Sequence, residues 1–177
     1  MSADYDPICA IGQDSHRFVA ADAAPGRPLR LGGVTLPEGP ALDGNSDADV
    51  LLHAVTNAVS GLTGVNVIGA AADRMCRDLG ITDSAAYLEE ALKSLGGIRL
   101  THLSVSIEGL RPKLTPHLPA IRARLSELLG IPGGAIGLTA TSGEGLTDFG
   151  RGAGIQVFCV LSAKRPAARR AEGPPAS

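Results

Sequence analysis

The chain has 177 residues, a formal net charge of −2, 44% hydrophobic residues and only 3% aromatic residues, with no tryptophan. This length suits one domain with its own hydrophobic core. The nearly neutral charge and the scarcity of aromatic side chains argue against a nucleic-acid-binding protein, which needs a basic surface or stacking platforms.

Three cysteines at unpaired spacing favour a reduced, cytoplasmic protein, in which Cys9 and Cys159 are expected to be small buried residues and Cys76 remains unassigned. The first residues do not resemble a signal peptide, and no apolar run has the length of a membrane span. We therefore expect no membrane partner.

Strands and helices are expected to alternate along the chain. A short strand over 8–11 is followed by a hairpin of Leu29–Leu31 and Val34–Leu36 around two glycines. Helices are expected over about 44–62, 84–95 and 116–129, and strands over 100–107, 136–140 and 154–162. The segment 70–83 has no clear assignment.

This order predicts an α+β fold, an α/β sandwich in which a mixed four-stranded sheet carries helices on one face and a small β-hairpin is added. Residues 1–163 are expected to form the domain. Residues 164–177 are rich in Pro, Ala and Arg and are expected to form a disordered C-terminal tail.

The helix expected from Gly44 to Leu62 organises the candidate site. Asn45 or Ser46 is expected to cap it, and apolar side chains at three- and four-residue spacing predict one buried stripe. The opposite, polar stripe carries Asp49, His53, Thr56, Asn57 and Ser60.

Asp14 and His16 follow the first strand, and residues two apart in an extended chain lie on the same side. With His53 they offer one carboxylate oxygen and two imidazole nitrogens, which suit a tetrahedral zinc site with one open position. The alternative, that both histidines simply make local hydrogen bonds, stays open from the spacing alone. His102 and His117 have no comparable neighbours and are expected to be structural or surface residues.

A glycine-rich stretch before the last strand carries Thr141, Ser142, Glu144 and Arg151. Hydroxyls and free backbone N–H groups at a strand end suit phosphate oxygens, a neighbouring carboxylate suits Mg²⁺, and a guanidinium can add a charged clamp. An ordinary connecting loop, in which glycines only permit turns, is the alternative. The loop Pro112-Lys113-Leu114 could recognise a base edge or a phosphate, although exposed loops of this kind are common.

Together these motifs resemble the family of 2-C-methyl-D-erythritol 2,4-cyclodiphosphate synthases over about residues 8–162. The resemblance rests on the order and spacing of several short motifs. They are Asp14-Ser15-His16-Arg17-Phe18, Leu31-Gly32-Gly33-Val34, Asn45-Ser46-Asp47-Ala48-Asp49-Val50, Leu52-His53-Ala54, Pro112-Lys113-Leu114, Ala140-Thr141 through Glu144, and Gly150-Arg151-Gly152.

The resemblance implies a lyase of the non-mevalonate isoprenoid pathway that cyclises a CDP-linked polyol phosphate and releases CMP. It implies Zn²⁺, or another divalent transition metal, on Asp14, His16 and His53, and Mg²⁺ on Glu144. Catalysis would depend on these four residues together with Thr141.

Substrate contacts follow from the same resemblance. Phosphates would meet a set made up of Asn45, Ser46, Thr141 and Ser142, and the cytosine would lie in the loop Pro112-Lys113-Leu114. The family's homotrimers have active sites at subunit interfaces and a central cavity that binds an isoprenoid diphosphate near the position of Arg151.

Three positions depart from the family pattern, and the family's Phe-Pro-Asp segment is replaced by Ala71-Ala72-Asp73. Asn45 stands where the family has His, Asn57 where it has Asp, and Val67 where it has the Asp that grips the polyol hydroxyls. Because replacing a buried polar partner by an apolar one costs roughly 1–3 kcal/mol, we hypothesise an altered polyol specificity. The alternative is a non-catalytic, trimeric ligand-binding or regulatory paralogue.

Overall fold

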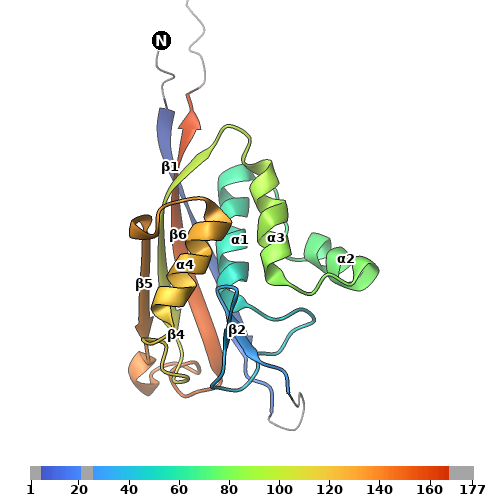
Figure 1. Ribbon diagram of the computed structural model, residues 1–177, viewed down its shortest axis with the longest axis vertical. Helices are drawn as coiled ribbons and strands as arrows, with labels where there is room; N and C mark the ends of the chain where they lie inside the picture. The colour runs from blue at the N-terminus through green and yellow to red at the C-terminus, as the bar shows by residue number, and fades with distance from the viewer. Residues whose placement is uncertain (1–4, 21–25, 168–177) are drawn as a thin grey trace, which may run out of the picture.

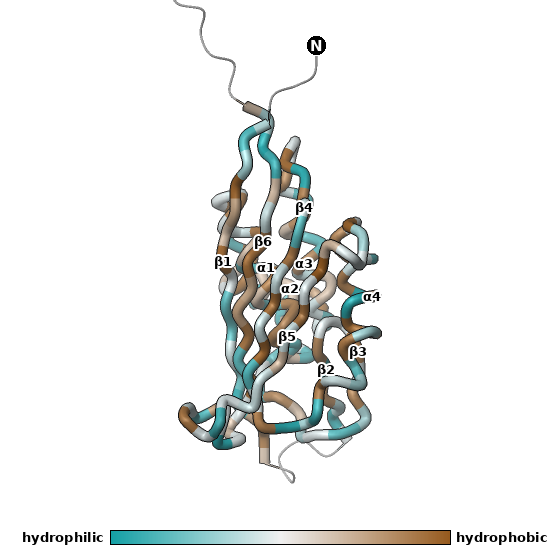
Figure 2. The backbone as a smooth tube through the Cα atoms, turned by 90° about the vertical axis from the view of Figure 1, so that its left-hand side faces the viewer, coloured by the Kyte–Doolittle hydropathy of each residue, from teal (hydrophilic) through white to brown (hydrophobic). Residues whose placement is uncertain are grey.

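A four-stranded mixed sheet, in the order β1-β6-β4-β5, forms one layer of the computed structural model, which describes residues 5–20 and 26–167. β1 (Tyr5–Arg17) and β4 (Arg99–Glu108) pair antiparallel with β6 (Gly154–Pro166), while β4 pairs parallel with β5 (Ile136–Thr141). Figure 2 shows the four strands side by side with the helices behind them. The expected α+β fold with a mixed sheet is confirmed.

α1 (Val50–Thr63) and α4 (Leu118–Leu129) cover one face of the sheet, and α3 (Ser84–Leu92) packs against both of these helices (Figure 1). A fourth helix, α2 (Ala70–Leu79), stands away from the sheet beyond α3. None of the helices within the described residues is long and apolar enough to cross a bilayer.

Shorter elements complete the fold. β2 (Leu29–Leu31) and β3 (Val34–Leu36) form the hairpin around Gly32 and Gly33. Three single turns of 3₁₀ helix are η1 (Lys93–Leu95), η2 (Gly133–Ala135) and η3 (Gly143–Gly145).

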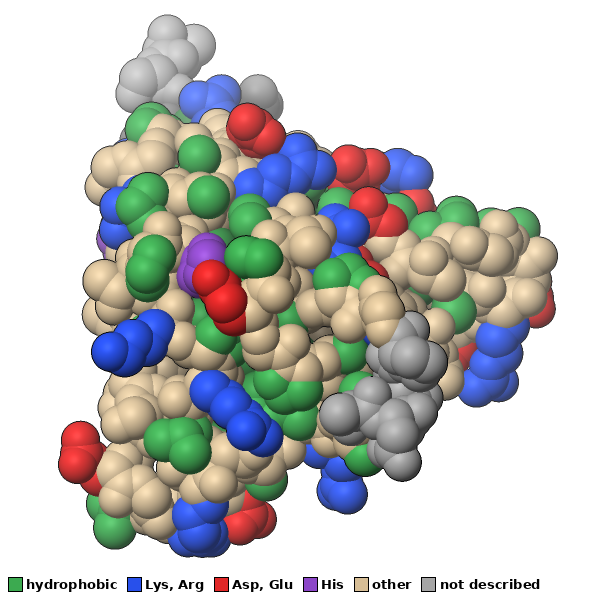
Figure 3. Space-filling model, turned by 60° about the horizontal axis from the view of Figure 1, so that its bottom comes forward, with side chains coloured by type: hydrophobic (Ala, Val, Ile, Leu, Met, Phe, Trp, Pro, Cys, Tyr) green, Lys and Arg blue, Asp and Glu red, His purple; other side chains and the backbone are tan. Residues whose placement is uncertain are grey.

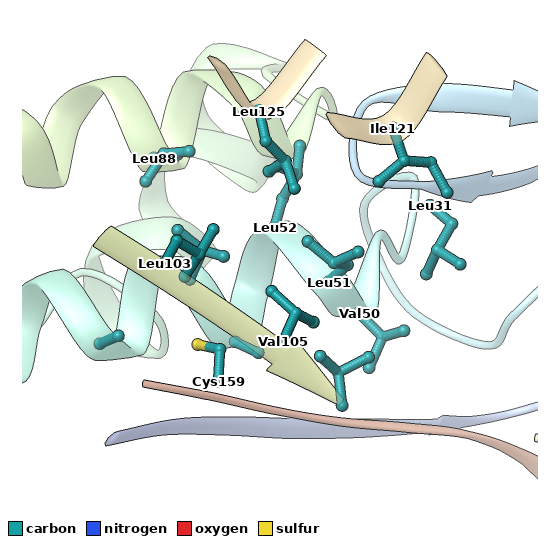
Figure 4. Close-up of a cluster of buried hydrophobic side chains, with 14 of the residues drawn as sticks. Leu31, Val50, Leu51, Leu52, Leu88, Leu103, Val105, Ile121, Leu125 and Cys159 are labelled. Carbon is teal, nitrogen blue, oxygen red and sulfur yellow. The ribbon is translucent and has the colours of Figure 1, made fainter. Parts of the chain in front are cut away.

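Side chains from all these layers meet in one core (Figure 4). Leu51 and Leu52 of α1 point toward Leu103 and Val105 of β4 and toward Ile121 of α4, and all five are almost fully buried. Burying each such side chain contributes about 1.5–3 kcal/mol. The core therefore holds α1 at a fixed position over the sheet.

The other face of the sheet has, among the described residues, no covering layer (Figure 2), and it carries an apolar patch on β1 and β6. Ile11 of β1 lies opposite Val160 of β6, and Phe158 lies two residues before Val160 on β6. All three are exposed, with Ile11 at 67%. Cys9 is also exposed, contrary to expectation, because alternation along β1 places it on this open side with Ile11.

The start of α1 differs from the prediction. The N-cap is Asp49 rather than Asn45 or Ser46, and its side chain accepts a hydrogen bond from the Leu52 N–H at 3.0 Å. Ala48 has a positive φ of 55°, which is incompatible with a helix that begins earlier. Residues 44–48 are therefore a loop.

The predicted polar stripe of α1 is mostly buried, because β1, α3 and the hairpin surround the helix. Asp49, His53, Thr56 and Ser60 are all buried, and Asn57 is half-buried.

Two further boundaries differ from the prediction. The unassigned segment contains α2, whose missing side-chain cap removes the usual helix-start signal. β6 continues to Pro166 because Tyr5–Pro7 of β1 pair with it, so residues 164–166 are strand rather than tail. The remainder of the predicted tail, residues 168–177, lies outside the described residues.

Candidate metal centre and its cavity

Asp14, His16 and His53 converge at the edge where β1 meets α1. Asp14 Oδ2 lies 2.9 Å from His53 Nδ1 and 3.2 Å from His16 Nε2, and the two histidine nitrogens are 3.2 Å apart. Ligand atoms of a tetrahedral zinc ion lie about 3.3 Å apart when each is about 2.0 Å from the metal. The three side chains predicted from the sequence therefore fit a single divalent ion.

Close backbone contact between β1 and α1 brings these ligands together. A Cβ on Gly12 would lie 1.9 Å from the carbonyl oxygen of Ala54, and a Cβ on Gly61 would lie 2.9 Å from the Cβ of Ala10. Two glycines therefore allow the strand and the helix to approach closely enough for Asp14 to reach His53.

Asp49 fixes the other side of α1. Besides capping the helix, its carboxylate accepts hydrogen bonds from the backbone N–H groups of Gly32 at 2.8 Å and Gly33 at 2.6 Å. Burial raises the pKa of Asp49, while these backbone donors act in the opposite direction. Asp49, which was expected on the polar stripe of α1, is thus the buried link between the hairpin and the helix.

Charge in the triad is balanced between Asp14 and His16. Burial alone would raise the pKa of Asp14, but hydrogen bonds to His16 and His53 and their positive charge hold it well below its ordinary value. Burial alone would lower the pKa of His16, but the contacts with Asp14 and with the Asp43 carbonyl raise it. An anion and a proton-binding imidazole therefore share the site.

His16 presents Nε2 to the triad because its other nitrogen is already bound. Nδ1 lies 2.5 Å from the carbonyl oxygen of Asp43, and a carbonyl can only accept, so Nδ1 carries the hydrogen. Nε2 is then the nitrogen that faces Asp14 and His53 and that a metal ion can bind. This is the tautomer that a metal ligand requires.

A cavity of about 260 Å³ opens beside the triad. Its remaining polar lining comes from Asn45 and Ser46 in the loop before α1, Asp73 and Cys76 of α2, and Tyr87 of α3. A space of this size beside a cation site suits a small polar molecule that carries negative charge.

The predicted phosphate-binding and Mg²⁺-binding residues lie in the glycine-rich loop before β6, outside the cavity beside the triad. Thr141, Ser142 and Glu144 are exposed and, within the part of the chain that the structure describes, do not line this cavity. The loop is held by internal contacts: Thr141 Oγ accepts from the Gly143 N–H at 3.1 Å, and Arg151 pairs with Asp148 at 2.7 Å. Glu144 has a positive φ of 52° and lies between Gly143 and Gly145, which also have positive φ.

The loop Pro112-Lys113-Leu114 also lies outside the cavity lining in the described structure. Lys113 is exposed, whereas Leu114 is buried in the hydrophobic core. Lys113 and the loop backbone are therefore the parts available to a ligand. Of the other two histidines, His102 is exposed on β4, and His117 pairs with Glu38 at 3.1 Å, in line with the expectation of structural or surface positions.

Several residues around the site cannot be recognised from the sequence. Ser84 Oγ lies 2.9 Å from His53 Nε2 and also contacts Asp47, while Asn57 donates to the Gln13 carbonyl at 3.0 Å. Asp73 lies in the segment 70–83, which has no clear assignment from local pattern. The one available signal is the Asp83-Ser84 helix start, which marks a cap but does not show what the serine contacts.

Comparison with known proteins agrees with this arrangement. A family model described as the YgbB family matches residues 8–164. The chain is 50% identical over 153 residues to 2-C-methyl-D-erythritol 2,4-cyclodiphosphate synthase of Chlamydia trachomatis (serovar L2b), covering 86% of this chain and 85% of that protein. It is 48% identical to the protein of the same name from Chlamydia caviae, covering 86% of each.

A solved structure of 2C-methyl-D-erythritol-2,4-cyclodiphosphate synthase, in its CDP-bound form, has the same fold. The TM-score is 0.77 at 31% identity, over 88% of this chain and 99% of that one. The chain therefore belongs to the YgbB family, the family of the 2-C-methyl-D-erythritol 2,4-cyclodiphosphate synthases.

Proposed function

We propose that this protein is a metal-dependent lyase that cyclises a CDP-linked polyol phosphate to a cyclic diphosphate and releases CMP, as a 2-C-methyl-D-erythritol 2,4-cyclodiphosphate synthase. The observation that carries the proposal is the convergence of Asp14, His16 and His53 to within 3.2 Å beside a cavity, in a chain half identical to synthases of that name. Its place in isoprenoid precursor synthesis follows from the same relatives.

The proposed reaction is an intramolecular displacement. An oxygen of the terminal phosphate attacks the β-phosphorus of the CDP group, the bond from that phosphorus to the bridging oxygen breaks, and CMP leaves with this oxygen. Zn²⁺ on the triad and Mg²⁺ on Glu144 would supply Lewis acidity toward the phosphate oxygens.

The protein's own residues orient and bind the substrate. Asn45 and Ser46 line the cavity beside the triad and would donate to phosphate oxygens. Thr141 and Ser142 would also donate to phosphate oxygens, from the glycine-rich loop. Lys113 would lie beside the cytosine of the CDP group. Positioning of this kind supplies most of the catalysis when no protein nucleophile takes part.

A homotrimer with interfacial active sites is part of the proposal. The loop that carries Thr141, Ser142 and Glu144 does not line the cavity of its own chain, as far as the described residues go, so a neighbouring copy is needed to bring both halves together. The open sheet face with Ile11, Phe158 and Val160 supplies apolar area for such contacts. The centre of this trimer would hold an isoprenoid diphosphate near Arg151.

The polyol end of the site differs from the family pattern, and the altered-specificity hypothesis rests on this. Val67 is only 4% exposed and belongs to the core, so it offers no contact to a polyol. Asn57 uses its amide to join α1 to the Gln13 carbonyl, which a carboxylate could not do. Asp73 is the remaining carboxylate on the described cavity wall besides Asp14.

The test is to incubate the purified protein with 4-diphosphocytidyl-2-C-methyl-D-erythritol 2-phosphate, Zn²⁺ and Mg²⁺, and to follow CMP by chromatography. CMP release that stops after chelation and in His53→Ala supports the proposal. His102→Ala is the matched control, because His102 is exposed on β4 away from the cavity. Absence of CMP release from the metal-loaded protein would contradict it.

A further inference from the structure

Ser84 and Asp47 lie behind His53, on the side away from the metal ligands. Ser84 Oγ is 2.9 Å from His53 Nε2 and also hydrogen-bonds to Asp47 Oδ1. Ser84 is completely buried. The three side chains come from α1, the start of α3 and the loop before α1, so their contact is a tertiary feature of the fold.

The chemistry of the groups determines the direction of each hydrogen bond that links Asp47, Ser84 and His53. An ionised carboxylate can only accept, so the single hydroxyl hydrogen of Ser84 points to Asp47. The serine oxygen must then accept from His53, and a hydrogen of that imidazole therefore sits on Nε2. Nδ1, which is 2.9 Å from Asp14 Oδ2, is consequently the nitrogen left to bind a metal ion.

Asp47 is held so that it cannot turn away from Ser84. Its Oδ2 accepts from the Ser84 backbone N–H at 3.3 Å and forms an ion pair with Arg30 Nε at 3.3 Å. Its own backbone N–H donates to the Thr82 carbonyl at 2.8 Å. Arg30 comes from β2, so the hairpin also supports this carboxylate.

We propose that Ser84 and Asp47 are positioning residues that fix the Nε2–H tautomer of His53 and thereby prepare Nδ1 as a metal ligand. The proposal rests on the metal centre of the proposed function and adds a role for residues that do not touch the ion. Removal of a hydrogen-bond partner behind a metal-bound histidine typically costs 10- to 100-fold in metal affinity. A loss of about this size is expected here.

The first variant is Ser84→Ala, which removes the acceptor for Nε2–H and leaves the Asp83 cap of α3 intact. Ser60→Ala is its matched control, because Ser60 is a buried serine of α1 whose hydroxyl has no partner within the described residues. Zinc affinity is measured on the full-length, metal-free protein by competition with a chromophoric chelator. We expect a loss of about 10- to 100-fold for Ser84→Ala and no change for Ser60→Ala.

The second variant, Asp47→Asn, keeps the size of the side chain but reverses the direction of the hydrogen bonds through Ser84 to His53. Arg30 and the Ser84 N–H are both donors, so they retain the amide oxygen, and the NH₂ group faces Ser84 Oγ. The serine hydrogen then points to His53 Nε2 and favours the Nδ1–H tautomer. Imidazole ¹⁵N NMR of the metal-free protein should show a hydrogen on His53 Nε2 in wild type and its loss from Nε2 in Asp47→Asn.

The outcomes are distinct. The positioning role is overturned if Ser84→Ala has the zinc affinity of wild type, or if Asp47→Asn keeps the hydrogen on His53 Nε2. Either result leaves the proposed function intact. A wild-type protein that binds no zinc overturns both. Weaker zinc binding together with the tautomer change supports the positioning role, because a merely structural serine would not move the imidazole hydrogen.

Discussion

Gly12 and Ala54 are in such close contact that a methyl group on Gly12 would lie 1.9 Å from the Ala54 carbonyl oxygen and 2.7 Å from the Ala58 nitrogen. Backbone atoms cannot move aside as a flexible side chain would. This contact sets the distance between β1 and α1, and hence the distance between Asp14 and His53.

Gly12→Ala should therefore destabilise the protein and weaken metal binding together. We expect the free energy of unfolding to fall by about 3 kcal/mol, because overpacking against backbone forces β1 and α1 apart. Urea denaturation measures this loss. Gly134→Ala is the control, since a methyl group on Gly134 would have no described atom within 4 Å and the residue has no positive φ. Equal stability of the two variants would contradict the expectation.

Zinc affinity should rise with pH across the raised pKa of His16. Below that pKa the imidazole is protonated and the ion must displace one proton, so the logarithm of the affinity should change by about one per pH unit. Titration calorimetry in buffers of different ionisation enthalpy counts the proton. An affinity that does not vary with pH would show that His16 is not a ligand.

Without metal, the same two groups should affect stability in opposite directions. The folded-state pKa of His16 is raised, so its contribution is present below its ordinary value of 6.5 and is lost as the pH rises through the raised value. The pKa of Asp14 is lowered, so its contribution is present above 3.8 and is lost as the pH falls through the lowered value. Chemical denaturation of the chelated protein at several pH values should show both losses, and His16→Ala should remove the loss at higher pH.

Subunit mixing tests whether the proposed site lies between copies of the chain. His53→Ala and Glu144→Gln should each be inactive, yet mixed trimers should regain activity because about a quarter of the interfaces combine two intact halves. CMP release is measured after subunit exchange, with tagged copies proving that mixed trimers form. Mixed trimers without activity would place both residues in one subunit's site.

Asp73→Ala tests the cavity wall contributed by α2. If Asp73 accepts hydrogen bonds from polyol hydroxyls, its loss should raise KM by roughly 10-fold with little change in kcat. Asp78→Ala is the control, because Asp78 lies on the same helix but does not line this cavity in the described structure. An unchanged KM would show that Asp73 is not a substrate contact.

The sequence allowed prediction of the parts of the site that depend on local geometry. Asp14 and His16 share a side through strand alternation, and His53 was placed on the right helix. Asp49 was misinterpreted, because its donors on Gly32 and Gly33 are 17 and 16 residues away and arrive only through tertiary packing. The contact between Ser84 and His53 spans 31 residues, so no local pattern could reveal it.

The surface of the isolated chain agrees with the composition. Figure 3 shows Lys and Arg side chains dispersed among acidic and apolar ones on the face that it views, rather than gathered in a basic patch. Cys9 was predicted wrongly because periodicity shows which residues share a face but does not show which face is covered.

The hairpin, the Asp49 cap and the glycine contacts hold the three candidate ligand atoms in place by means of the polypeptide alone. A hydrated ion that enters would lose water and displace one proton from His16, and no segment of the chain would have to fold first. Loading speed should then reflect how readily each hydrated ion exchanges its water, and replacement of one divalent ion by another should leave the backbone unchanged.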